Sequence, residues 1–248
     1  MHHEIASSCI KNGKPIIVEK PLTLCLEDAE SLILLAEKNK INVKVNHIYL
    51  YHPEFRILKK NISKEFNLKS IYSLSGNFGP FRNDVSPLWD WGPHDIAMCL
   101  SIMNNFPDKI EAKYIKREIS SSNNRSNISI KLFFQNDKYA DLNFGNLMKN
   151  KKRYFKVSSQ SSNLIFNPIN NLKITKETDN KLTEIIDENE EKSHDLNQSP
   201  LEILLKEFSS EIINSKFYLS DLLLSRDVVA VLENADRKLK KIIPKNDQ

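Results

Sequence analysis

Two hydrophobic patterns alternate over the first 50 residues of the chain. Apolar residues recur at helical spacing over residues 2–11, and again in a segment whose apolar face includes Ala29 and Ala36. Each segment is followed by a short apolar run, Ile16–Val18 and then Ile41–Val45, which is typical of a buried strand. The order helix, strand, helix, strand predicts a parallel α/β unit.

The pattern changes after residue 50. We expect a helix over 54–60, a strand over Ile71–Phe78 and a helix that begins at Pro93, with Gly92 as its N-cap. Further strand-like segments follow, joined by short polar stretches: Ile110–Ile119, Ile128–Phe134, Tyr139–Phe144 and Tyr154–Ser158. Successive strands with short polar joints predict an antiparallel sheet.

The end of the chain predicts two amphipathic helices, one that opens at Pro200 and one that opens at Ser220. Residues 176–198 are rich in charged and amide side chains, and we expect them to form a mobile excursion at the surface. A parallel sheet of two strands is not stable by itself. We therefore expect the opening unit to be the C-terminal part of a larger domain.

Composition excludes several classes of function. The net charge of +4 is small, and no stretch approaches the about 18 apolar residues that a membrane helix needs. The one basic run, residues 149–153, is read as a solvated turn between strands rather than a nucleic-acid site. We therefore expect neither a nucleic-acid nor a membrane partner.

Cysteine and histidine spacing points to no metal. Cys9, Cys25 and Cys99 lie far apart without a CxxC motif, and His2, His3 and His194 show no metal-ligand spacing. The three cysteines and the lack of a signal peptide fit a reducing compartment, so we expect a cytoplasmic protein.

Polar side chains follow both strands of the opening unit. Glu19, Lys20 and Pro21 come directly after the first strand. The second strand is followed by a further set of polar and aromatic residues: Asn46, His47, Tyr49, Tyr51, His52 and Pro53. Ligands of open α/β sheets bind beyond the carboxyl ends of parallel strands, so these residues are candidates for one shared cleft. The alternative is that both strands simply end in polar residues.

The segment SPLWDWGPHDIA, residues 86–97, holds both tryptophans of the chain with Asp90 and His94. A histidine in the first turn of a helix, close to a carboxylate, could be a base poised near neutral pH, which proton abstraction from an alcohol requires. The alternative is that Asp90 caps the helix and His94 fills a gap. Arg82, in the preceding loop, could hold an anionic or polyhydroxy ligand, and either Trp89 or Trp91 could pack on a sugar ring.

These segments resemble the glucose–fructose oxidoreductase / inositol dehydrogenase / MocA (Gfo/Idh/MocA) family. The stretch ending in Glu19-Lys20-Pro21 is similar to the family's Glu-Lys-Pro signature, and Asp90-Trp-Gly-Pro-His94 is similar to its Asp-x-x-x-His stretch. The resemblance implies the end of a Rossmann domain over residues 1–48. It also implies an α/β domain with an open, mostly antiparallel sheet over 49–248.

The resemblance also implies an activity. The family transfers a hydride between NAD or NADP and a sugar, nucleotide sugar or cyclitol, and its members associate through the antiparallel sheet, so we expect a homo-oligomer. Lys20, Asp90 and His94 would be catalytic, with His94 as the general base and Asp90 orienting it. Glu19, Lys20, Pro21 and Asn46 would contact the cofactor, and Arg82, Trp91 and Tyr49 the substrate.

The sequence departs from the family at its front. No three of its five glycines fit the G-x-G-x-x-G fingerprint that cradles the pyrophosphate of a dinucleotide. We therefore expect that roughly two βαβ units, about 30 residues each, are missing, and that this chain alone is inactive. The alternative is a non-catalytic carbohydrate-binding or oligomerisation module, although such a module would not need to retain Lys20 or His94.

Overall fold

The computed structural model describes residues 1–62, 66–118, 124–169, 174–179, 181–185 and 198–242. Near the N-terminus, strands β1 (Ile16–Val18) and β2 (Val43–Val45) form a two-stranded parallel sheet, packed with helices α1 (His2–Lys11) and α2 (Leu26–Asn39). Their small core is built from residues such as Ala6, Ile10, Leu22 and Leu32. The predicted parallel α/β unit is confirmed.

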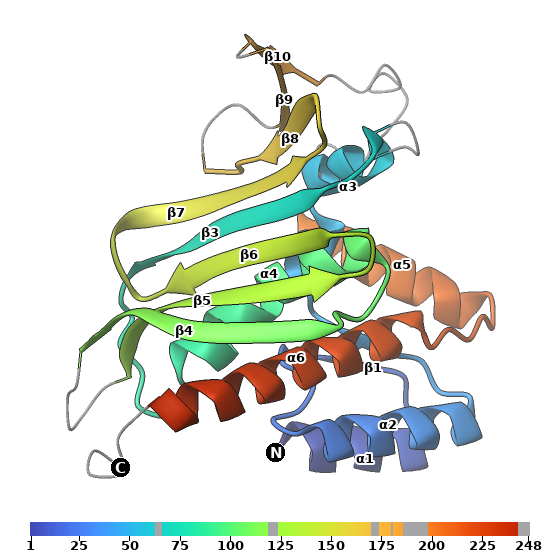
Figure 1. Ribbon diagram of the computed structural model, residues 1–248. Coiled ribbons are helices and arrows are strands. Elements are labelled where there is room, and N and C mark those ends of the chain that lie inside the picture. Colours follow the sequence, from blue (N-terminus) through green and yellow to red (C-terminus); the bar gives the residue numbers. More distant parts are fainter. Residues whose placement is uncertain (63–65, 119–123, 170–173, 180, 186–197, 243–248) are drawn as a thin grey trace.

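The larger sheet has eight strands in the order β10-β9-β8-β7-β3-β6-β5-β4 (Figure 1). Only β3 and β6 pair in parallel, and every other pair is antiparallel. The predicted open, mostly antiparallel sheet is therefore confirmed. The strands are β3 (Ser70–Phe78), β4 (Lys109–Glu118), β5 (Arg125–Phe134), β6 (Lys138–Gly145), β7 (Leu147–Ser158), β8 (Ser162–Phe166), β9 (Ile174–Thr178) and β10 (Lys181–Glu184).

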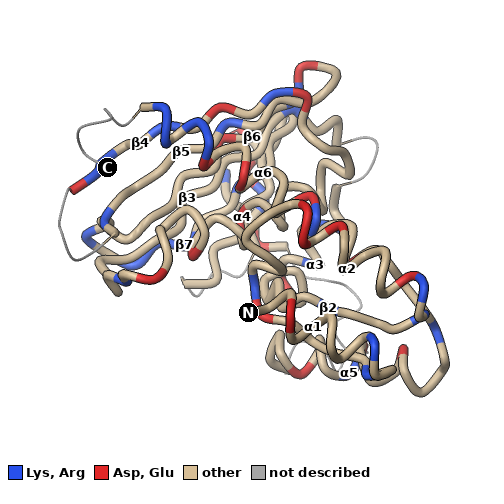
Figure 2. The backbone as a smooth tube through the Cα atoms, turned by 90° about the horizontal axis from the view of Figure 1, so that it is seen from below, with Lys and Arg blue, Asp and Glu red and all other residues tan. Residues whose placement is uncertain are grey.

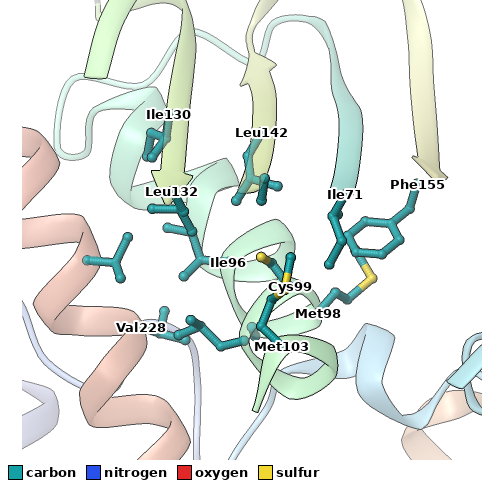
Figure 3. Packing of buried hydrophobic residues seen from close by; sticks show 14 of the residues in the cluster. Ile71, Ile96, Met98, Cys99, Met103, Ile130, Leu132, Leu142, Phe155 and Val228 are labelled. Carbon is teal, nitrogen blue, oxygen red and sulfur yellow. The ribbon is translucent and has the colours of Figure 1, made fainter. Parts of the chain in front are cut away.

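The main core lies between this sheet and helices α4 (Pro87–Met103) and α6 (Ser220–Ile242). Figure 3 shows Ile96 and Cys99 of α4 beneath Leu132 and Leu142 of the sheet, with Val228 of α6 beside them. In the described part of the chain, no helix covers the opposite face of the sheet (Figure 1). Figure 2 shows acidic and basic residues interspersed along the backbone rather than gathered by sign.

Helix α6 belongs to both cores. Its Leu222 and Val229 pack in the small core, while Val228 and Leu232 pack in the main core. Trp89 of α4 also contacts both. The two sheets are thus joined through a shared helix and a shared tryptophan.

The remaining helices connect the two sheets. The 3-10 turn η1 (Ile48–Tyr51) and helix α3 (Pro53–Lys60) follow β2, and α5 (Pro200–Ile213) packs against η1. Buried Lys44 of β2 forms ion pairs with Glu211 of α5 at 2.9 Å and with Asp221 of α6 at 2.7 Å.

One glycine marks a close approach of strands in the larger sheet. Gly145, which pairs with Gly76, has φ of +156°, and a Cβ built on it would lie 2.2 Å from the main-chain oxygen of Ser126. No larger residue fits there without movement of the backbone.

Three expectations about elements were wrong. Helix α4 begins at Pro87 with Ser86 as its N-cap, so Pro93 lies inside the helix. Gly92-Pro93 carries a helix-start signal, but Pro87 carries the same signal six positions earlier, and packing against both cores favours the longer helix.

Residues 149–153 lie within β7 rather than in a turn. Part of the expected excursion at 176–198 forms strands β9 and β10, while 186–197 and Ile119 lie outside the described residues. In both places the sheet pairing was missed because polar and charged residues are poor strand signals.

Candidate active site

Strands β1 and β2 end side by side, and the polar residues that follow them meet. The Asn46 side chain donates a hydrogen bond to Glu19 Oε1 at 2.9 Å, and the Asn46 backbone N–H donates to the Val18 carbonyl at 2.8 Å. The shared cleft predicted from the two strand ends therefore has a geometric basis. Asn46 Oδ1 is buried without a hydrogen-bond partner, which leaves one acceptor available at this edge.

Lys20 reaches from the end of β1 to the first turn of α4. Its Nζ donates to Asp90 Oδ1 at 3.0 Å and to the Asp90 main-chain oxygen at 2.6 Å. Both side chains are mostly buried, at 18% and 24% exposure. An ammonium and a carboxylate from segments 70 residues apart thus meet, and Pro21 follows Lys20 through a cis peptide bond.

His94 lies one turn further along α4, with its ring edge-on to the Tyr49 ring at 5.1 Å between centroids. Burial lowers the pKa of His94 well below its usual 6.5, and the positive charges of Arg153 and Lys20 lower it further. The imidazole is therefore neutral near pH 7 and able to accept a proton. The helix N-terminus is not the cause we expected, because His94 is not in the first turn.

Asp90 does not hold His94 in the expected way. Its carboxylate is paired with Lys20, while Nδ1 of His94 is buried without a hydrogen-bond partner. The structure thus assigns Asp90 to the lysine rather than to the imidazole.

A second buried histidine, His47, belongs to the same cluster; it was among the residues expected at the end of β2 but was given no role there. Its side chain is 3% exposed, and neither ring nitrogen has a hydrogen-bond partner. Burial lowers the pKa of His47 to about 4, and Lys20 also contributes.

A cavity of about 290 Å³ opens beside this cluster. Tyr49 and Trp91, the residues expected to contact the substrate, line it together with His52. The other lining residues were not among the candidates: Ile48, Lys151, Lys152, Arg153, Pro168, Ile169 and Pro200. Trp89 instead packs between the two cores. A larger hollow of about 760 Å³ lies between α1 and α2, but it includes none of the predicted site residues.

Arg82 lies outside this cavity. Its side chain is about half exposed. Nε donates a hydrogen bond to Asp84 Oδ1 at 3.0 Å, and Nη2 donates one to Asp84 Oδ2 at 2.8 Å. A ligand would have to compete with Asp84 for the guanidinium.

Neither a metal cluster nor a membrane helix is found among the described residues. No group of three or more His, Cys, Asp and Glu in the described ranges could hold a metal ion, and His194 lies outside them. No helix built from the described residues combines the length and the hydrophobicity that a membrane crossing needs.

Comparison with known proteins gives the site a family context. Residues 1–47 match the model of an oxidoreductase family with an NAD-binding Rossmann fold. The scyllo-inositol 2-dehydrogenase (NADP(+)) of Bacillus subtilis is 30% identical over 89 residues, which are 36% of this chain and 25% of that protein. The UDP-N-acetylglucosamine 3-dehydrogenase of Acidithiobacillus ferrooxidans is 25% identical over 114 residues, 45% of this chain and 35% of that protein.

Solved structures extend the likeness to nearly the whole chain. A protein of Magnetospirillum magnetotacticum superposes with a TM-score of 0.80 at 27% identity, covering 94% of this chain and 75% of that one. A levoglucosan dehydrogenase in complex with NADH and levoglucosan has the same fold, with a TM-score of 0.79 at 15% identity over 97% of this chain and 75% of that one.

The chain spans about a quarter to a third of the curated relatives that it matches, and about three quarters of the solved structures. The family model, the relatives, the fold and the two signature motifs agree with one another. They show that the chain is similar to oxidoreductases of the Gfo/Idh/MocA family.

Proposed function

We propose that this protein is an NAD(P)-dependent dehydrogenase that acts on a hydroxyl group of a sugar, nucleotide sugar or cyclitol. The observation that carries the proposal is the convergence of the Lys20–Asp90 ion pair and a neutral His94 beside a cavity walled by Trp91 and Tyr49. The named activities of the scyllo-inositol and UDP-N-acetylglucosamine dehydrogenases support the same reaction class.

His94 is the proton acceptor in this proposal. During oxidation of the alcohol it takes the hydroxyl proton, and during reduction it returns that proton to the carbonyl oxygen. Lys20 donates a hydrogen bond to the same substrate oxygen and stabilises negative charge as it develops there. Asp90 holds the Lys20 ammonium in place through the contacts at 3.0 and 2.6 Å.

The nicotinamide ring of NAD or NADP supplies the hydride acceptor or donor. Glu19, Pro21 and Asn46 stand at the carboxyl ends of β1 and β2, where an α/β sheet binds its ligand. The unpartnered Asn46 Oδ1 would accept a hydrogen bond from a cofactor hydroxyl or amide. Trp91 and Tyr49 would hold the substrate ring, and Arg82 would contact it only after release from Asp84.

In this proposal residues 1–48 bind the cofactor, and residues 49–248 bind the substrate.

We further propose that the protein is a cytoplasmic homo-oligomer whose copies pack through the uncovered face of the larger sheet. Tyr72 and Tyr139 are exposed on β3 and β6, and the Tyr72 ring contacts Tyr154 of β7 at 6.2 Å between centroids. Such a tyrosine cluster is suited to bury against a second copy.

The test is a spectrophotometric assay of nicotinamide reduction on the protein as its gene encodes it, with any residues that precede Met1. The substrates are a panel of sugars, nucleotide sugars and cyclitols, each with NAD and with NADP. We expect His94→Asn to lower kcat by about 10²–10⁴ and Lys20→Met by at least about 10². His3→Gln, a partly exposed histidine of α1 that contacts Ser31 and lies outside the cavity, is the matched control and should leave kcat unchanged.

Two results would contradict the proposal. A folded protein that turns over no member of the panel with either nucleotide is not this dehydrogenase and would favour the binding-module alternative. Unchanged kcat in His94→Asn would remove the imidazole from the reaction.

A further inference from the structure

Arg153 of β7 is a buried cation whose hydrogen-bonding capacity is largely unused. Its side chain is only 5% exposed. Nη1 donates to Asp95 Oδ2 at 3.3 Å, while Nε and Nη2 are buried without any hydrogen-bond partner. Buried arginines usually have their donors satisfied, because an unsatisfied charged donor costs free energy. The free N–H groups therefore point to a ligand.

The guanidinium is held in a fixed orientation. Asp95 of α4 anchors it from one side, and the Ser75 hydroxyl donates a hydrogen bond to that same carboxylate. The Tyr49 ring lies 3.5 Å from the guanidinium carbon, close enough for a stacked cation–π contact. Nε and Nη2 thus belong to a group that Asp95 and Tyr49 hold in place, with Ser75 fixing the Asp95 carboxylate.

Arg153 is one of the residues that line the cavity walled by Tyr49 and Trp91. Arg153 lines it together with Lys151 and Lys152, two exposed lysines of the same strand, and its described lining residues include no aspartate or glutamate. Tyr49 joins the two parts of the site, because its ring contacts both the Arg153 guanidinium and the His94 imidazole. A ligand in the cavity would therefore meet concentrated positive charge close to the proposed base.

We propose that the substrate of the proposed dehydrogenase carries an oxyanion, a phosphate or a carboxylate, which binds to Arg153 Nε and Nη2 with support from Lys151 and Lys152. Two adjacent N–H donors of a guanidinium match two oxygens of a phosphate or carboxylate. With the anion fixed at that end of the cavity, the sugar ring lies along Tyr49 and Trp91, and its reacting hydroxyl approaches His94. This inference rests on the proposed function and narrows its substrate class to anionic sugars.

The test compares three sugars by isothermal titration calorimetry on residues 1–248: glucose 1-phosphate, glucuronate and glucose. We expect at least one of the two anionic sugars to bind about tenfold or more tightly than glucose. Comparing the phosphate with the carboxylate shows which oxyanion the cavity prefers. Arg153→Met should abolish the preference, and Lys149→Met, an exposed lysine of the same strand outside the cavity, should retain it.

A second variant guards against misfolding of Arg153→Met, which leaves Asp95 without its partner. Replacing both Lys151 and Lys152 by alanine removes only exposed side chains, and it should weaken anion binding and reduce its salt dependence. Equal affinity for all three sugars, or a preference that survives both variants, would overturn the inference.

Failure of the inference can be told apart from failure of the proposed function. Turnover of neutral polyols without an anionic preference would leave the dehydrogenase intact and reject only the oxyanion site. Anionic preference in a protein that turns over no substrate would keep the oxyanion site and reject the dehydrogenase.

Discussion

Replacing His47 by glutamine tests whether a buried neutral imidazole limits the stability of the fold in acid. His47 is 3% exposed with no hydrogen-bond partner on either nitrogen, and burial lowers its pKa from 6.5 to about 4. Between those two values the unfolded chain binds a proton that the folded chain excludes. The free energy of unfolding must therefore decrease as the pH drops below 6.5. The contribution of His47 to this decrease stops once the pH reaches the pKa of His47 in the folded chain, about 4.

The magnitude follows from the two pKa values. With 6.5 for the unfolded chain and about 4 for the folded one, proton linkage gives a loss of about 2 kcal/mol between pH 7.5 and pH 5.0. Urea unfolding at the two pH values measures it. The pH-dependent loss in His47→Gln should be smaller than in the wild type by about 2 kcal/mol, because glutamine does not titrate. The other titrating groups are common to both proteins and cancel in this comparison.

Val45→Ala, in the adjacent strand, is the control. It removes buried methyl groups and should lower the free energy of unfolding by about 2 kcal/mol at both pH values, leaving the pH-dependent loss as in the wild type. If His47→Gln loses as much stability between pH 7.5 and 5.0 as the wild type, the imidazole is not held neutral by the fold and the reasoning is refuted.

Three further predictions concern other parts of the molecule. Lys44→Met should lower the free energy of unfolding by about 2–4 kcal/mol, measured in urea, since it leaves two mostly buried carboxylates without their cation; a loss below about 0.5 kcal/mol would show that the pairs are unimportant. Gly145→Ala should lower the melting temperature much more than Gly13→Ala, because a Cβ at Gly13 meets nothing within 4 Å; equal effects would contradict the close strand approach. The acidic limb of kcat/KM for alcohol oxidation should lie below pH 6.5, since His94 must be neutral to accept a proton and its pKa is lowered. Arg153→Met should move the acidic limb to higher pH, because it removes a positive charge that lowers the pKa of His94. An acidic limb at unchanged pH would show that Arg153 does not act on His94.

Local patterns predicted the parallel unit and the residues at its strand ends. Buried parallel strands are continuous apolar runs, and their polar neighbours stand at the carboxyl edge whatever the rest of the chain does. Glu19, Lys20 and Asn46 were therefore found from the sequence alone. The ion pair between Lys20 and Asp90 was not predicted, because no local rule joins residues 70 positions apart and the resemblance implied a role for Asp90 toward His94.

The residues that the sequence missed depend on distant packing. Arg153 is the last residue of a basic run that the sequence predicted to be solvated. In the structure it lies within β7 with its side chain buried, in contact with Asp95 and Tyr49. The start of α4 was misplaced because Pro87 and Pro93 give the same local signal, and the contacts that extend the helix come from both cores. Such contacts lie beyond any window of neighbouring residues.

The shared helix α6 has a consequence for how the molecule moves and melts. Different sides of α6 are buried in the two cores. A hinge motion between the small sheet and the large one would therefore expose apolar side chains of one core to water. Rotation of the two halves relative to each other is thus costly, and the placement of Lys20 beside Asp90 is fixed by this packing. Heat should accordingly melt both halves in one calorimetric peak, with equal van't Hoff and calorimetric enthalpies.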